Sequence, residues 1–206
     1  MMMFAIKKKA VSVAIVSIIS SLSFAASAAP AAPAAPTATA NGGTINFTGK
    51  VTDVTCTVKV NGGTNNGTVA LPPVSTASLA KSGDVAGMTS FTVSLDNCKS
   101  AGATLAAGKT AAVFFEAGAD VDSATGLLLN HKASGAGAVA LELVDNSNSS
   151  HHAIIAGDAA QQANTTKIAI DPQGTTILPY AVRYHATGAA TAGDVESSVV
   201  YSVMYN

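Results

Sequence analysis

Gly193–Asn206, with the sequence GDVESSVVYSVMYN, is the stretch that decides how this chain folds. Every second residue belongs to one face, and serine is the only polar member of that set: Val195, Ser197, Val199, Tyr201, Val203 and Tyr205. Because successive side chains of a strand point to opposite sides, this alternation predicts a β-strand with one face toward a core. Such a strand has to be covered in the folded state, either by its own sheet or by another chain.

Shorter alternating runs precede this stretch, and clusters of Gly, Asn, Asp and Ser such as Asn61–Gly63 separate them. No sustained 3.6-residue period follows the first 28 residues. The sequence therefore predicts an all-β, antiparallel sandwich. The further strands that we expect are Ile45–Val51, Val54–Val60, Val69–Leu71, Phe91–Leu95, Ala111–Phe115, Val139–Leu143, Ile168–Ile170 and Ile177–Tyr184.

Two segments depart from simple alternation. The apolar residues change from odd to even positions between Val51 and Val54, so the chain has to bulge or bend there to keep both sets on the core. Asn146–Asn164 is polar and rich in alanine, without a convincing period. We expect it to be a long surface loop.

The first 28 residues have the features of a secretory signal peptide. Lys7–Lys9 precede an apolar run over Ala10–Ile19, and Ala26–Ala28 supply an A-x-A cleavage pattern. The apolar run is too short for a helix that spans a bilayer core of about 30 Å. We expect cleavage after Ala28 and export. Removing 28 of the 206 residues leaves 178, enough for one domain with its own core.

The charge balance disfavours a nucleic-acid-binding protein. The chain has 11 Lys and Arg and 12 Asp and Glu, and losing the three lysines of the signal peptide leaves 8 against 12, a net charge of −4. A net acidic domain lacks the positive surface that neutralises phosphates.

Cys56 and Cys98 are the two cysteines of the chain. In an exported protein we expect them to form a disulfide, because oxidising compartments favour pairing. Closing that loop should stabilise the fold by about 4 kcal/mol through the unfolded chain. A zinc site is a poor alternative, since neither cysteine has a CxxC partner or a nearby His.

The remaining motifs do not combine into a site for catalysis or metal binding. Ser78 and Lys81 fit S-x-x-K but lack the companion motifs of serine acyl enzymes, so a surface turn is the better interpretation. Gly135–Ala140 fits a loose dinucleotide fingerprint, yet a strand-like run follows where that motif needs a helix. His151 and His152 are adjacent, so their side chains diverge. We expect no catalytic residues, no metal and no cofactor.

Three stretches resemble the major structural subunits of chaperone–usher fimbriae, the type 1 pilins and their relatives. They are Asn41–Cys56 (NGGTINFTGKVTDVTC), Phe91–Cys98 (FTVSLDNC) and Ile177–Asn206. The last is the most specific, because a glycine fourteenth from the end, alternating apolar residues and a penultimate tyrosine are similar to that family's chaperone-recognition strand. In this chain the pattern falls on Gly193, Val199, Tyr201, Val203 and Tyr205.

The resemblance implies the pilin fold, an incomplete immunoglobulin-like sandwich of six strands with a groove in place of a seventh. It implies that a periplasmic chaperone fills the groove before delivery to an outer-membrane usher. In the fibre, a homopolymer of identical or related subunits on the bacterial surface, the extension of the next subunit fills it. An open edge beside an apolar face also invites strand addition on physical grounds.

The resemblance assigns the role of donor strand to Gly43, Ile45 and Phe47. The prolines between residues 30 and 36 cannot donate ladder hydrogen bonds, so Thr37–Phe47 is the better candidate within the extension. We therefore expect a signal peptide over residues 1–28, an extension over 29–43 whose donor region reaches about residue 47, and a pilin domain over 44–206.

The function that we expect is that of a structural subunit which polymerises by donor-strand exchange and supports surface adhesion, and not that of an enzyme. The alternative is a minor tip or adhesin subunit that binds host glycans. A tip adhesin normally needs an additional receptor-binding domain, which argues for the first interpretation. A secreted hydrolase lacks a nucleophile and base.

Overall fold

The computed structural model describes residues 51–206. The expected donor positions Gly43, Ile45 and Phe47 lie outside the described residues, as does the segment expected to be a signal peptide. Over residues 51–206, no helix is long and apolar enough to cross a membrane.

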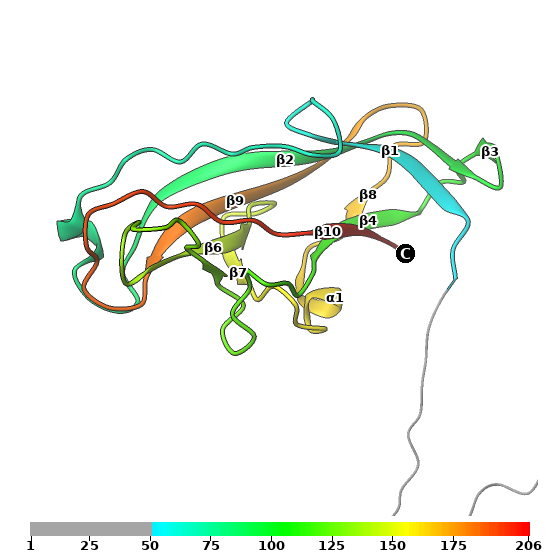
Figure 1. Cartoon of the computed structure of the whole chain (residues 1–206). Helices are drawn as coiled ribbons and strands as arrows, with labels where there is room; N and C mark the ends of the chain where they lie inside the picture. Colours follow the sequence, from blue (N-terminus) through cyan, green and yellow to red (C-terminus); the bar gives the residue numbers. More distant parts are fainter. Residues whose placement is uncertain (1–50) are drawn as a thin grey trace, which may run out of the picture. The chain divides into compact units, whose positions relative to one another are not determined.

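Seven antiparallel strands form the larger sheet, sheet A. Their order is β1-β2-β9-β6-β5, with β3 beside β2 and β7 beside β6 (Figure 1). The strands are β1 (Val54–Val60), β2 (Val85–Ser100), β3 (Ala103–Thr104), β5 (Leu128–Leu129), β6 (Val139–Asp145), β7 (His152–Ile154) and β9 (Thr176–Ala186).

Three antiparallel strands form the smaller sheet, sheet B, in the order β10-β4-β8. They are β10 (Tyr201–Tyr205), β4 (Thr110–Phe115) and β8 (Ile168–Ala169). A 3-10 turn, η1 (Thr76–Leu79), and a one-turn helix, α1 (Gln161–Asn164), are the helical elements of the described residues. The predicted all-β class is confirmed.

The core lies where the alternating apolar faces of the strands meet. Its largest fully buried side chains come from β2, β9 and β4: Val93, Leu95, Leu178, Val113 and Phe115. Val144 of β6 is also fully buried, but it lies on the face opposite to the core residues Leu141 and Leu143. The spacing of two within β2 and within β4 is the period of a strand that buries one face. Each sheet thus contributes the face that the sequence pattern predicted.

A disulfide joins Cys56 of β1 to Cys98 of β2, as predicted. Val54 and Val60, at the two ends of β1, are buried, so the even positions of this strand face the core as the sequence indicated. The disulfide ties the outermost strand of sheet A to its neighbour.

The pairing of β1 with β2 shifts register between Thr55 and Thr57. This shift is not the bulge that the sequence predicts between Val51 and Val54, which stays a prediction because the residues before Val51 lie outside the described residues. The extra residue belongs to β2, in which Asn97 has a φ of 52°. Val51 precedes the strand and is exposed.

Two predictions are wrong. Val69–Leu71 is not a strand, because this segment has no strand to pair with among residues 51–206. Asn146–Asn164 is not a loop throughout, since it contains β7 and α1. Its buried residues, Ile154, Ala156 and Gln161, are too few to give a period in the sequence.

Candidate functional site

The C-terminal segment, Gly193–Asn206, runs along the length of the described unit (red in Figure 1). Its second part is β10, which pairs with β4 and has no strand on its other side among residues 51–206. The predicted strand is therefore present over Tyr201–Tyr205, whereas Val195–Val200 belongs to neither sheet.

Alternate residues of this segment are half-buried, in the phase that the sequence predicted: Val195, Ser197, Val199, Tyr201, Val203 and Tyr205. The residues between them up to Ser202 are exposed, Val200 to 70%. Partial burial raises the pKa of the Tyr201 and Tyr205 hydroxyls above the usual value. These apolar side chains pack against the core and yet keep part of their surface in contact with solvent.

A second row of half-buried side chains faces the first. Cys56 and Val58 of β1, together with Val69 and Leu71 of the following segment, pack against the same core without being fully covered. Two rows of incompletely buried core residues therefore border one opening. A row of this kind is the apolar face that another strand would cover.

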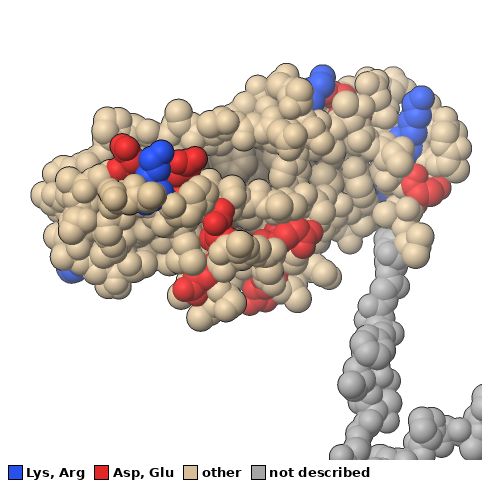
Figure 2. Space-filling view, in the orientation of Figure 1, with Lys and Arg blue, Asp and Glu red and all other residues tan. Residues whose placement is uncertain are grey.

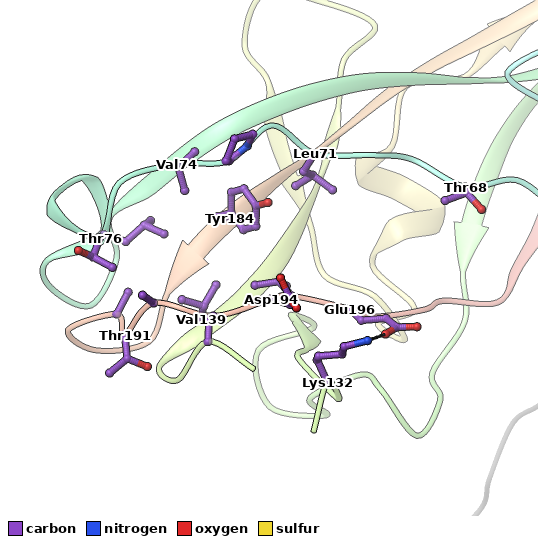
Figure 3. A pocket seen from close by; sticks show the side chains of 17 residues that line it. Thr68, Leu71, Val74, Thr76, Lys132, Val139, Tyr184, Thr191, Asp194 and Glu196 are labelled. Atoms are coloured by element: carbon purple, nitrogen blue, oxygen red, sulfur yellow. Dashed lines mark hydrogen bonds and ion pairs between the residues drawn. The ribbon is translucent and has the colours of Figure 1, made fainter. Parts of the chain in front are cut away.

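Two cavities follow each other between these rows, and we call them together the groove. One, of about 460 Å³, lies between Val58–Val60, Asn65–Gly67 and Val199–Val203. The other, of about 650 Å³, lies between Leu71, Tyr184 and the residues around Gly193–Glu196 (Figure 3). The space-filling view shows this face hollowed; a mixed cluster of charged side chains lies at one end, and further charged side chains lie below the hollow and at the other end (Figure 2).

The edge of β10 presents unpaired backbone groups to the groove. Thr110 and Asn206 exchange both backbone hydrogen bonds, at 3.1 and 2.9 Å, and the Glu116 amide donates to the Val200 carbonyl at 2.8 Å. Since hydrogen-bonded and non-bonded pairs alternate in an antiparallel ladder, Tyr201, Val203 and Tyr205 direct their N–H and C=O groups away from β4. This arrangement can bind an extended chain by backbone hydrogen bonds.

On the side of β4 that faces away from β10, the backbone groups have partners, and we call this side the closed edge. There Ala111 pairs with β8, and the Val113 amide donates to the hydroxyl of Tyr180 at 2.8 Å. The Phe115 amide donates to Oε1 of Gln161 at 3.0 Å, and Nε2 of Gln161 donates to the Phe115 carbonyl at 3.0 Å. Sequence reasoning missed Gln161, which lies in the stretch predicted as a loop; no local pattern marks it.

Gly193 lies where a side chain has no room. A Cβ at this position would come within 2.6 Å of the carbonyl carbon of Gly135 and 2.9 Å of the Cα of Ala136. The Asp194 carbonyl next to it accepts a hydrogen bond from the Ala136 amide at 2.9 Å. The glycine singled out in the sequence therefore permits close approach of two backbones at one end of the groove.

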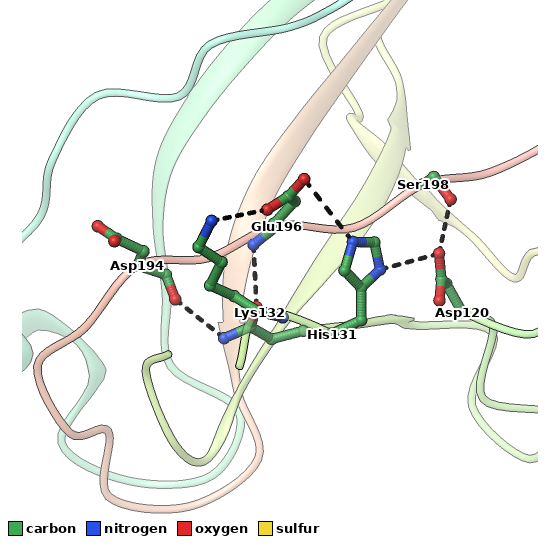
Figure 4. Close-up of polar contacts among 7 residues, drawn as sticks. Asp120, His131, Lys132, Asp194, Glu196 and Ser198 are labelled. Atoms are coloured by element: carbon green, nitrogen blue, oxygen red, sulfur yellow. Dashed lines mark hydrogen bonds and ion pairs between the residues drawn. The ribbon is translucent and has the colours of Figure 1, made fainter. Parts of the chain in front are cut away.

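A cluster of charged side chains lies at the same end (Figure 4). Nδ1 of His131 is 3.0 Å from Oδ2 of Asp120, which also accepts a hydrogen bond from the hydroxyl of Ser198 at 2.6 Å. Nζ of Lys132 is 3.1 Å from Oε2 of Glu196. The hydrogen bond from Ser198 lowers the pKa of Asp120, and that from Lys132 lowers the pKa of Glu196.

The site has the chemistry of a binding surface. Within residues 51–206, no group of three or more His, Cys, Asp or Glu side chains could hold a metal ion. The structure gathers Val199, Tyr201 and Val203 on one wall of the groove, with Gly193 at its end. Tyr205 continues this row and packs half-buried against the core, but it lines neither cavity. The proposed donor residues are not part of the described chain.

Known proteins resemble this chain over most of its length. The family model described as "FimA: Type-1 fimbrial protein, A" matches residues 71–206. The major fimbrial subunit SMF-1 of Stenotrophomonas maltophilia (strain K279a) is 43% identical over 170 residues, which cover 82% of this chain and 95% of that protein. The F17 fimbrial protein of Escherichia coli is 42% identical over 163 residues, covering 79% and 87%.

Among solved structures, a chain from a chaperone–usher pilus superposes with a TM-score of 0.50. The two sequences are 18% identical, and the match covers 84% of this chain and 100% of that one. At this level of identity the likeness concerns the fold.

Proposed function

Because the chain belongs to the type-1 fimbrial protein family, a family of structural and non-enzymatic subunits of chaperone–usher fimbriae, we propose that it polymerises by accepting a strand from another subunit. One observation carries the proposal. The unpaired backbone edge of Tyr201, Val203 and Tyr205 borders a groove whose apolar walls are half-covered core. A strand in that groove would complete both the hydrogen-bond ladder and the burial.

The donor that we propose is Thr37–Phe47 of a second copy. It contains eleven residues, the same length as Val195–Tyr205, so two extended segments of these lengths match along the groove. Residues 29–47 contain no Asp, Glu, Lys or Arg, which suits an apolar groove. Gly43, Ile45 and Phe47 would face the core from the donated strand.

Assembly in this scheme proceeds from one subunit to the next. The donor segment and the groove are different surfaces, so each subunit donates to one neighbour and accepts from another, and nothing requires the chain of subunits to close. A periplasmic chaperone would fill the groove before an outer-membrane usher adds the subunit. The product is a surface fimbrium that supports adhesion.

The proposed route begins with removal of residues 1–28 and export through the periplasm. The test is intact-mass measurement of the protein taken from fimbriae. It should show loss of about 28 residues, from the A-x-A pattern, and of two hydrogens, from the disulfide between Cys56 and Cys98. An intact N-terminus would contradict the proposed processing.

The decisive experiment supplies the donor strand within one chain. A variant that begins at Lys50 should not polymerise, whereas attaching Thr37–Lys50 to its C-terminus through a flexible hairpin turn should give a soluble, self-complemented monomer. Burying Ile45 and Phe47 should contribute about 1.5–3 kcal/mol each. Size-exclusion chromatography and thermal melting measure both results.

The matched control carries Ile45→Asp and Phe47→Asp in the attached segment. It has the same length and turn but would bring charges into the groove, so it should melt no higher than the truncated protein. Strand donation by this segment is wrong if the truncated protein forms ordinary fibres, or if the grafted monomer and its control melt at the same temperature.

A further inference from the structure

The groove wall is held in two different ways along its length. Over β10, the ladder to β4 holds it. Over Gly193–Ser198 no strand of residues 51–206 pairs with it, and its backbone contacts come from the segment between β5 and β6. The inference below rests on the proposed function, because it concerns how this first half of the wall is positioned for a donated strand.

Asn130 is the centre of these contacts. Its Oδ1 accepts hydrogen bonds from the amides of Glu196 and Lys132, at 2.9 and 3.1 Å. Its Nδ2 donates to the carbonyls of Asp194 and Ala136, at 3.1 and 2.9 Å. The carboxamide thereby uses both of its donors and both lone pairs of its oxygen. It binds the wall through one carbonyl and one amide, as a residue of a neighbouring strand would.

The two residues that follow Asn130 also bind Glu196. The His131 amide donates to the Glu196 carbonyl at 2.9 Å, and Nζ of Lys132 pairs with the Glu196 carboxylate at 3.1 Å. We call Asn130, His131 and Lys132 the clamp. Through the clamp, Glu196 is bound by its amide, its carbonyl and its side chain, although it belongs to neither sheet of the described residues. Figure 4 shows the contacts of its side chain with His131 and Lys132.

The clamp and β4 bind the same side of the C-terminal segment. The clamp contacts the backbone of Asp194 and Glu196, and β4 contacts that of Val200 and Asn206, all at even positions. In an extended chain, the backbone groups of the odd positions then point the other way, toward the groove. Val195 and Ser197 consequently continue the open edge that starts in β10.

The hydroxyl of Ser197 gives an independent sign that this half of the groove is incomplete in the isolated subunit. Its Oγ is buried and has no hydrogen-bond partner among the described residues. A buried polar atom without a partner is rare in a finished core. In the sequence, Ser197 lies between Glu196, which lines one cavity of the groove, and Val199, which lines the other.

We propose that Asn130 is a positioning residue for strand acceptance, and that through the clamp it extends the acceptor edge from the three open residues of β10 to the whole of Val195–Tyr205. The partner is the uncharged N-terminal strand of a second copy of this chain. Without the clamp, a donated strand would pair over β10 alone.

Hydrogen–deuterium exchange of assembled fibres of the full chain tests this positioning role. In the native fibre, the amides of Val195 and Ser197 should exchange as slowly as those of Tyr201 and Val203. In Asn130→Ala fibres, Val195 and Ser197 should exchange about tenfold faster or more, as expected for losing one or two hydrogen bonds, while Tyr201 and Val203 stay protected. A merely structural loss would raise exchange throughout the subunit.

Two further variants make the result unambiguous. Asn148→Ala removes an exposed asparagine whose side chain also makes hydrogen bonds, with Ser150 and Thr166, but which lies away from the groove, so exchange at Val195 should not change. Asn130→Asp keeps the acceptor for the Glu196 amide and should be intermediate. If Asn130→Ala does not fold, the exchange of Val195 and Ser197 is measured in Asn130→Asp fibres instead.

The outcomes separate the two proposals. Native exchange at Val195 and Ser197 in both Asn130 variants would overturn the positioning role while leaving strand acceptance intact. Rapid exchange of Tyr201 and Val203 in native fibres would instead contradict strand acceptance itself.

Discussion

The outer side of β10 and the side of β4 that faces away from β10 are built in opposite ways. On the side of β8, side chains provide the partners for the β4 residues beyond the short strand β8. The hydroxyl of Tyr180 accepts the amide hydrogen of Val113, and the carboxamide of Gln161 accepts that of Phe115. On the side of β10, Tyr201, Val203 and Tyr205 direct their backbone groups away from β4, and Tyr201 and Val203 line the groove. The chain thus has the means to close an edge with side chains. The open edge is therefore a specific feature of this subunit and not a consequence of the small size of the sheet.

The largest effect should come from a charge on the open edge. Tyr205→Asp would place a carboxylate in an apolar groove without a partner, at a cost of several kcal/mol, so strand acceptance should fall by about a hundredfold or more. Electron microscopy should show loss of fibres. The control is Val200→Asp, because Val200 is 70% exposed on the other face. Normal fibre numbers with Tyr205→Asp would show that this edge does not accept the strand.

The second largest effect should come from alkaline pH, which should destabilise the fold by ionising Tyr180 at the closed edge. Burial raises the pKa of Tyr180 to about 12, above the ordinary value of 10.0. Stability from the neutral hydroxyl is complete below pH 10 and is lost as the pH rises toward 12, by about 3 kcal/mol for two pKa units. Circular dichroism and tyrosine absorbance from pH 8 to 12 measure the transition.

The Tyr180→Phe variant sharpens this test. It should be less stable at neutral pH, because the buried Val113 amide loses its partner, but its stability should depend less on alkaline pH. An unchanged alkaline midpoint would show that another group causes the transition.

Removing the second closing side chain should have a somewhat smaller effect. Gln161→Ala leaves the buried Phe115 amide without a partner, so the free energy of unfolding should fall by about 2 kcal/mol in urea. Gln162→Ala, which truncates the exposed neighbouring residue, should stay within about 0.5 kcal/mol of the native value. Both variants should still form fibres, since the open edge is intact. Equal stability of the two variants would remove the role given to Gln161.

Acid should have the smallest effect, at the clamped end of the open edge. The pKa of Asp120 is lowered by Ser198 and that of Glu196 by Lys132. Stability from these carboxylates is present above their ordinary pKa of about 4 and is lost as the pH falls through the lower folded values. Melting temperatures from pH 7 to pH 3 should fall more for the native protein than for Asp120→Asn with Glu196→Gln. Identical profiles would contradict this.

Much of the open edge was predictable from the sequence. The alternation over Val195–Tyr205 appears in the structure as alternating burial, and the disulfide between Cys56 and Cys98 and the even phase of β1 are also confirmed. The extent of the strand was not predictable, since Val195–Val200 has the pattern of a strand and yet no strand partner. Val69–Leu71 was wrongly predicted as a strand for the same reason: alternation in the sequence does not show whether a partner strand is present.

What the sequence by itself determined is which residues of a strand share a face, because covalent geometry places successive side chains on opposite sides whatever the strand meets. Only the tertiary structure decided which edge stays open, how Gln161 and Tyr180 close the other, and that Asn130 replaces a strand beside Glu196. Each of those contacts joins residues more than forty positions apart, and hydrogen-bond partners at such distances leave no local pattern in a sequence.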